Sequence, residues 1–112
     1  MDPGHARQLL ARERERIERT LAELRREDDD DPDPFEPSDV APDLLEEEIE
    51  QGLAERQRDE LEAVERAERR LAEGIYGLSV ESGEPIPDAR LEAIPWAERT
   101  AEEQARYELR RR

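Results

Sequence analysis

Apolar residues recur through the first quarter of the chain at steps of three, four and seven residues, with charged residues between them. These apolar positions are Leu10, Ile17, Leu21 and Leu24. Residues at such steps lie on one side of an α-helix. The pattern therefore predicts a helix from about His5 to Glu27 whose narrow apolar seam packs against a partner helix.

The same period returns in the middle of the chain and predicts a second, longer helix. Its apolar positions are Leu44, Leu45, Ile49, Leu53, Leu61, Val64 and Leu71. We expect this helix to end near Glu73, with Gly74 as its C-terminal cap. Asp39 is a candidate N-cap, because Pro42 can stand in the first turn, where its missing N–H is tolerated.

A proline-rich acidic stretch, EDDDDPDPFEPSDVAPD, separates the two periodic segments. Proline cannot continue a helix and clustered carboxylates repel one another, so we expect an acidic tip loop over residues 28–42. Carboxylates could also suggest Mg²⁺ binding or acid–base catalysis. A proline-rich loop does not preorganise such a site, so we expect no enzymatic activity.

Two amphipathic segments joined by a loop predict an antiparallel coiled-coil hairpin over residues 5–73. The remaining bulky residues lie between Ile75 and Trp96, and they predict a small lobe over residues 74–112. Helix-forming residues return after Trp96, so we expect a short C-terminal helix from about Ala97 to Leu109. The predicted fold class is all-α.

Composition narrows the choice of partner. The chain has 112 residues, of which 34% are hydrophobic and 46% charged, with a formal net charge of −15. This charge opposes attraction to DNA, RNA or an anionic membrane, so we expect a basic protein partner and no sequence-specific nucleic-acid binding. The N-terminal MDPGHARQLL lacks the apolar core of a signal peptide, which predicts a cytoplasmic protein. We also expect a monomer and a solvated His5.

The segment from Tyr76 to Gln104 contains two pairs of residues at the spacing of a four-cysteine zinc site. The pairs are Ser79 with Ser82, and Thr100 with Glu103. The chain contains no cysteine. Three hydroxyls and one carboxylate include no soft or borderline ligand, so we expect no structural zinc and no other cofactor.

The stretch LAEGIYGLSVESGEPIPDARLEAIPWAERTAEEQ resembles the zinc-finger region of the DksA/TraR family. Members typically read Y-G-x-C-x-x-C-G-x-x-I-P-x-x-R-L-x-A-x-P-x-A-x-x-C-x-x-C. Tyr76, Gly77, Gly83, Ile86, Pro87, Arg90, Leu91, Ala93, Pro95 and Ala97 fall in register. All four family cysteines are replaced, which makes the lobe a degenerate zinc finger. Zinc contributes about 10 kcal/mol or more to such domains, and apolar packing around Trp96 is our candidate replacement.

The resemblance also implies a function. In the family the hairpin tip carries an acidic D-x-x-D-x-A motif, and the corresponding EPSDVA contains Glu36, Asp39 and Ala41. Such members bind bacterial RNA polymerase, insert the coiled coil into its secondary channel and alter initiation. The resemblance therefore implies a non-enzymatic transcription regulator whose tip residues act near the polymerase active centre.

Two points stay open at the level of sequence. The acid run Asp28 to Asp31 is either a solvated loop or part of the surface that enters the polymerase channel with Glu36 and Asp39. The alternative function is that of a structural or adaptor coiled coil, which binds another basic partner or self-associates through its seam.

Overall fold

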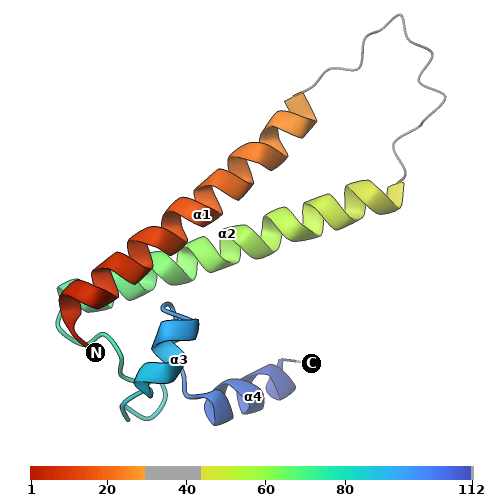
Figure 1. The fold of residues 1–112 in the computed structure, drawn as a ribbon. Coiled ribbons are helices and arrows are strands. Elements are labelled where there is room, and N and C mark those ends of the chain that lie inside the picture. The colour runs from red at the N-terminus through yellow and green to blue at the C-terminus, as the bar shows by residue number, and fades with distance from the viewer. Residues whose placement is uncertain (30–43, 112) are drawn as a thin grey trace, which may run out of the picture.

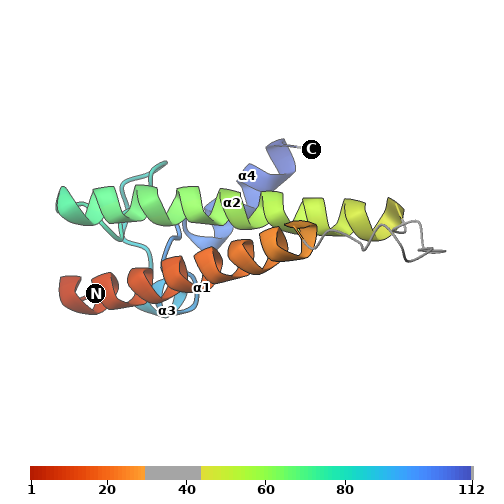
Figure 2. The same ribbon diagram turned by 90° about the horizontal axis from the view of Figure 1, so that it is seen from above.

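The computed structural model describes residues 1–29 and 44–111. Helix α1 (Pro3–Asp29) and helix α2 (Leu44–Ala72) form an antiparallel pair. Buried residues of the two helices meet in one cluster, and the helices diverge toward the end away from the N-terminus in Figure 1. The view from above in Figure 2 shows them apart at the end that contains the N-terminus, so the helices cross at an angle. The predicted helical hairpin is confirmed.

The packed half of the hairpin has a core that both helices supply. Leu10 and Ile17 of α1 are buried against Val64 and Ala67 of α2. Leu21, Leu61 and Leu71 pack against this cluster and are partly buried. Arg14 of α1 spans the seam on the outside and forms an ion pair with Glu68. The predicted seam is therefore correct for this half of the hairpin.

In the other half of α2, the prediction that the apolar residues are buried against α1 is wrong. Leu45, Ile49 and Leu53 are 60%, 62% and 38% exposed. They belong to the same ladder of i, i+4 positions as Gln57, which is only 7% exposed. The helices diverge toward this end of α2 (Figure 1), and α1 leaves these three side chains exposed.

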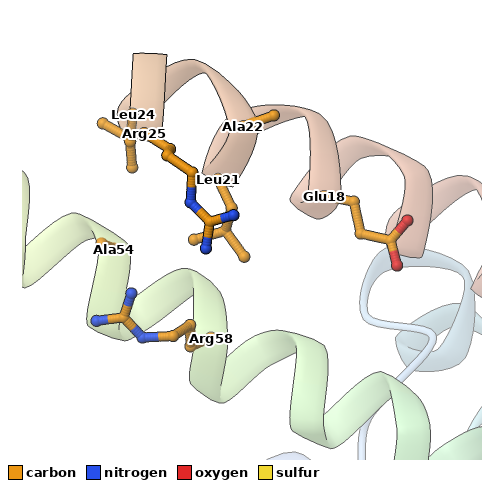
Figure 3. A pocket seen from close by; sticks show the side chains of 7 residues that line it. All are labelled: Glu18, Leu21, Ala22, Leu24, Arg25, Ala54 and Arg58. Atoms are coloured by element: carbon orange, nitrogen blue, oxygen red, sulfur yellow. The ribbon is translucent and has the colours of Figure 1, made fainter. Parts of the chain in front are cut away.

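A groove of about 330 Å³ separates the diverging helices. Leu21, Leu24 and Arg25 project from α1 toward it, and Ala54 and Arg58 border it on α2 (Figure 3). The Arg25 guanidinium points into the gap, whereas the Arg58 side chain extends along α2 toward Ala54 (Figure 3).

Helix α2 ends in a Schellman motif. The Ile75 N–H donates to the Arg70 carbonyl at 2.9 Å, and the Gly74 N–H donates to the Leu71 carbonyl at 3.2 Å. Gly74 has φ +78°, which glycine adopts without a steric penalty. The sequence prediction of Gly74 as the C-terminal cap is therefore confirmed, and the motif turns the chain back along α2 into the lobe.

The lobe contains two short helices, α3 (Asp88–Ala93) and α4 (Ala101–Arg110). Ile86, Leu91 and Ala97 form its buried core, and Met1, Tyr76 and Ile94 pack against them. Leu78 and Pro85 form one isolated antiparallel bridge. The described residues contain no β-strand, so the all-α prediction is confirmed. Helix α3 was missed, although Pro-Asp followed by helix-forming residues is a usable N-terminal signal.

The start of α1 is attached to the lobe. The Asp2 carboxylate accepts from the His5 N–H at 3.0 Å and so caps the helix. The Met1 side chain packs in the lobe core, and the His5 ring pairs with Glu92 on α3. His5 is exposed, as predicted for a solvated residue, but it does have a partner, because the hairpin places α3 beside the first turn of α1.

Residues 1–29 and 44–111 include no helix that combines the length and the apolar character needed to span a membrane.

Candidate functional site

The four positions that correspond to the family cysteines converge in the lobe. Ser79 and Glu103 come from segments 24 residues apart, and the Ser79 hydroxyl donates to Glu103 Oε2 at 3.0 Å. Both residues are buried, with 5% and 6% of their surfaces exposed. Ser82 and Thr100 flank this contact from the two sides of the lobe. The four residues singled out in the sequence thus lie close together in the lobe.

Thr100 and Glu103 form a capping box at the start of α4. The Glu103 N–H donates to Thr100 Oγ1 at 3.2 Å, and Glu103 Oε1 accepts from the Thr100 N–H at 2.9 Å. These reciprocal bonds end the preceding loop and begin the helix at Ala101. The predicted start near Ala97 was too early, because the capping box determines where α4 begins.

Ser79 organises the opposite side of the site. Its Oγ accepts from the Glu81 N–H at 3.1 Å and from the Ser82 N–H at 3.2 Å, while it donates to Glu103. The Gly83 N–H closes the same turn on the Ser79 carbonyl at 3.0 Å, and Gly83 has φ +74°. One serine thus connects a tight turn to the first turn of α4.

The Glu103 carboxylate is the centre of this network. The backbone N–H of Thr100, followed by the hydroxyls of Ser79, Ser82 and Thr100, lowers the pKa of Glu103 to about 2, against the opposing effect of burial. The carboxylate also lies in the first turn of α4, where the helix dipole favours negative charge. Glu103 is therefore ionised at neutral pH and acts as an acceptor from several groups at once.

A second set of contacts closes the site from the outside. Glu81 pairs with Arg99 at 3.1 Å and with Arg110 of α4 at 3.0 Å. The Val80 N–H donates to the Glu98 carbonyl at 2.9 Å. The turn that contains Ser79 is thus joined to the α4 segment by backbone and by charged groups as well.

The donor set does not fit the zinc ion that the family description implies. Ser79 and Thr100 use their hydroxyl oxygens as acceptors from backbone N–H groups, and both Glu103 oxygens accept hydrogen bonds. Neutral hydroxyls are poor zinc ligands, and no thiolate or imidazole lies in the set. Within the described ranges, no cluster of three or more His, Cys, Asp or Glu residues could hold a metal ion.

Trp96 has a different role from the one that the sequence suggested. We expected it to lie at the centre of an apolar cluster that replaces zinc inside the lobe. It packs instead against the hairpin cluster of Leu10, Ile17, Val64 and Ala67, and the lobe has its own core. Trp96 therefore attaches the lobe to the hairpin, while the Glu103 network closes the lobe.

Tyr76 and Glu98 strengthen the same attachment. Tyr76 packs against both the hairpin cluster and the lobe core, and its hydroxyl donates to the Pro95 carbonyl at 2.8 Å. Burial raises the pKa of Tyr76 to about 12. Glu98 pairs with Arg66 at 2.7 Å and with Arg70 at 3.6 Å on α2. The lobe is thus held to α2 by apolar, hydrogen-bonded and ionic contacts.

The predicted tip residues Glu36, Asp39 and Ala41 lie outside the described residues, as do Asp30 and Asp31 of the acid run. Asp28 and Asp29 belong to the last turn of α1. The proposed N-cap role of Asp39 also lies outside the described ranges.

Comparison with known proteins places these features in a family. The sequence model of the prokaryotic dksA/traR C4-type zinc finger matches residues 74–109. The RNA polymerase-binding transcription factor DksA of Caulobacter vibrioides is 47% identical over 58 residues, which are 52% of this chain and 41% of that protein. General stress protein 16O of Bacillus subtilis is 43% identical over 58 residues, 52% of this chain and 36% of that protein. The match thus spans about two fifths of these curated relatives.

A solved structure extends the likeness to almost the whole chain. Transcription factor DksA2 from Pseudomonas aeruginosa superposes with a TM-score of 0.72 at 34% identity, covering 97% of this chain and 84% of that chain. The chain therefore belongs to the DksA/TraR family, as a member without cysteine.

Proposed function

We propose that this protein is a transcription regulator that binds bacterial RNA polymerase and is not an enzyme. The hairpin enters the secondary channel of the polymerase, and the acidic tip with Glu36, Asp39 and Ala41 modulates initiation near the active centre. The observation that carries this proposal is the hairpin-and-lobe architecture, which matches a DksA2 structure over 97% of this chain.

The attachment of the lobe to the hairpin supports this function mechanically. Helix α2 has 29 residues, which corresponds to about 43 Å at 1.5 Å per residue. Its C-terminal half is fixed to the lobe through Trp96, Tyr76 and Glu98. A helix anchored at one end can hold its other end at a defined distance from a binding surface, as a channel-inserting hairpin requires.

The net charge of −15 supports a polymerase surface rather than nucleic acid as the direct partner. We propose binding as a monomer in the cytoplasm, without sequence-specific contact to DNA. A pull-down from bacterial extract at low salt tests the partner. Recovery of polymerase subunits supports the proposal, whereas their absence favours an adaptor coiled coil with another basic partner.

The variant Asp39→Asn tests the role of the tip. Asn and Asp are about equally good N-caps, so the fold is expected to keep its stability. The variant removes a negative charge from a confined site, where charge matters more than at an exposed surface. We expect near-normal polymerase binding with a lost or reversed effect on initiation in reconstituted transcription. Two results together would contradict this role of Asp39: Asp39→Asn acts on initiation like wild type, and neutralising Asp28 to Asp31 abolishes the effect. They would show that the acid run, and not Asp39, acts at the tip.

A further inference from the structure

The distal half of α2 presents an apolar stripe that no described residue covers. Ile49 is 62% and Leu53 is 38% exposed, four residues apart on one face of the helix. The same ladder of positions continues into Gln57 and Leu61, which are buried in or packed against the hairpin core. The stripe is thus the direct continuation of an established helix–helix interface, without the partner helix.

The charges around the stripe indicate what it can bind. The segment from Leu44 to Glu55 contains five glutamates and no basic residue. Apolar side chains bordered by carboxylates fit a partner surface that has apolar side chains bordered by Lys or Arg. A second copy of this chain would bring the same carboxylates into contact with these, which opposes self-association through the stripe.

The chain's own α1 is also a poor occupant. Arg25 points from α1 into the groove between the diverging helices, and Arg58 lines the α2 side of it (Figure 3). Bringing the helices together would move these two guanidinium groups toward each other while the groove closes. Like charges therefore oppose closure of α1 onto this half of α2.

We propose that Ile49 and Leu53 form a docking surface for a basic amphipathic segment of RNA polymerase. The two side chains insert among apolar side chains of that segment, and its Lys or Arg side chains pair with Glu46 and Glu50, which lie three residues before Ile49 and Leu53 and so border the stripe. This inference rests on the proposed function and adds to it the residues of the hairpin flank that supply affinity. Under this inference, residues of α2 supply affinity for the polymerase, and the tip residues change initiation.

The test uses the full chain with both stripe residues changed, Ile49→Ser with Leu53→Ser, and purified RNA polymerase. The matched control is Leu109→Ser on α4, where the leucine is 65% exposed. We expect the double variant to bind polymerase at least about tenfold more weakly, because buried apolar anchors dominate interface energy. Leu109→Ser is expected to bind within about twofold of wild type, since isolated surface changes have small effects.

A charge variant gives an independent measurement. Glu46→Gln with Glu50→Gln is expected to weaken binding severalfold at low salt, with the difference shrinking as salt is raised, because exposed ion pairs are screened. The isolated double-serine variant is expected to keep its melting temperature and its monomeric state.

Each contrary outcome is distinct. Unchanged polymerase affinity of the double-serine variant, beside a wild-type chain that binds, overturns the docking surface alone. A marked loss of melting temperature in the isolated variant shows that the chain itself covers the stripe. A wild-type dimer that the variant abolishes shows that a second copy does so, and either result overturns the inference. Failure of the wild-type chain to bind polymerase overturns the proposed function, and this inference with it.

Discussion

The Ser79 hydroxyl and the Glu103 carboxylate, 24 residues apart in sequence, meet at 3.0 Å within the region that the zinc-finger model matches. A zinc ion would join four ligands by coordination. Here a buried carboxylate joins two segments by accepting hydrogen bonds from both of them. The zinc-finger model matches residues 74–109, and within them these hydrogen bonds join the two segments.

The pH dependence of the unfolding free energy tests whether the ionised Glu103 carboxylate stabilises the lobe. The folded-state pKa of Glu103 is lowered to about 2 from an ordinary 4.5. A depressed folded pKa contributes stability that is present above pH 4.5 and is lost as pH falls from 4.5 toward 2. Chemical unfolding followed by Trp96 fluorescence at several pH values should show this loss in the wild type.

Other carboxylates titrate in the same range, so the comparison needs variants. In Glu103→Gln the part of the pH dependence that comes from Glu103 is expected to disappear, and the melting temperature at pH 7 to fall by roughly 5 °C or more. Glu108→Gln, at an exposed position of the same helix, is expected to behave like wild type. Identical pH profiles for Glu103→Gln and wild type would show that the carboxylate does not hold the lobe.

Metal content provides a second test. We expect purified protein to contain far less than one zinc per chain and chelators to leave its melting curve unchanged, because the donor set lacks soft ligands. The matched variant changes Ser79, Ser82, Thr100 and Glu103 to cysteine and so restores the family ligands. It should bind about one zinc and become sensitive to chelators. Stoichiometric zinc in the wild-type chain would contradict this account.

Substitutions of two isoleucines test the difference between the packed and the open half of the hairpin. Ile17 is fully buried and Ile49 is 62% exposed. Ile17→Ala should lower the free energy of unfolding by about 2–5 kcal/mol, as buried large-to-small changes do. Ile49→Ala should lower it by less than about 0.5 kcal/mol, which is the usual range for surface changes. Urea titrations of both variants decide the point, and equal losses would mean that the distal helices are closed in solution.

Substitutions of Trp96 and Leu91 distinguish the attachment of the lobe to the hairpin from the packing inside the lobe. Trp96→Ala should cost about 3 kcal/mol of unfolding free energy and free the lobe from the hairpin. Leu91→Ala should loosen the lobe itself, because Leu91 is 1% exposed in the lobe core. Limited proteolysis distinguishes them, since cleavage within residues 75–100 should increase more in Leu91→Ala. A larger increase in cleavage in Trp96→Ala than in Leu91→Ala would mean that Trp96 stabilises the interior of the lobe.

The two long helices were predictable from the sequence because the signals for them lie within short stretches of the chain. Apolar spacing identifies a helix face, and Gly74 marks a helix end through a backbone conformation that other residues avoid. Divergence of the helices toward the N-terminal end of α2 was not predictable, since Ile49 and Leu53 fit the seam pattern as well as Val64 does. Whether a seam position is covered depends on the path of the opposite helix, which the spacing along α2 does not contain.

We missed the local chemistry of Thr100 and Glu103 in the sequence. Thr100 and Glu103 stand three residues apart, which is the spacing of a cysteine pair and also of a capping box. Reading the pair only as lost ligands placed the start of α4 near Ala97 and assigned the stabilising role to Trp96. The capping-box reading was available from the same four letters, TAEE, and it leads directly to Glu103.

The oxygen-based closure of the lobe changes how the protein reaches its working state. A cysteine-ligated lobe completes its folding by capturing a second component, so its rate depends on the supply of metal. Closure by Ser79, Thr100 and Glu103 is a first-order step within one chain, complete as soon as the segments meet. It also offers no thiolate for peroxides or electrophiles to attack, because hydroxyl and carboxylate oxygens lie outside the oxidation chemistry of sulfur.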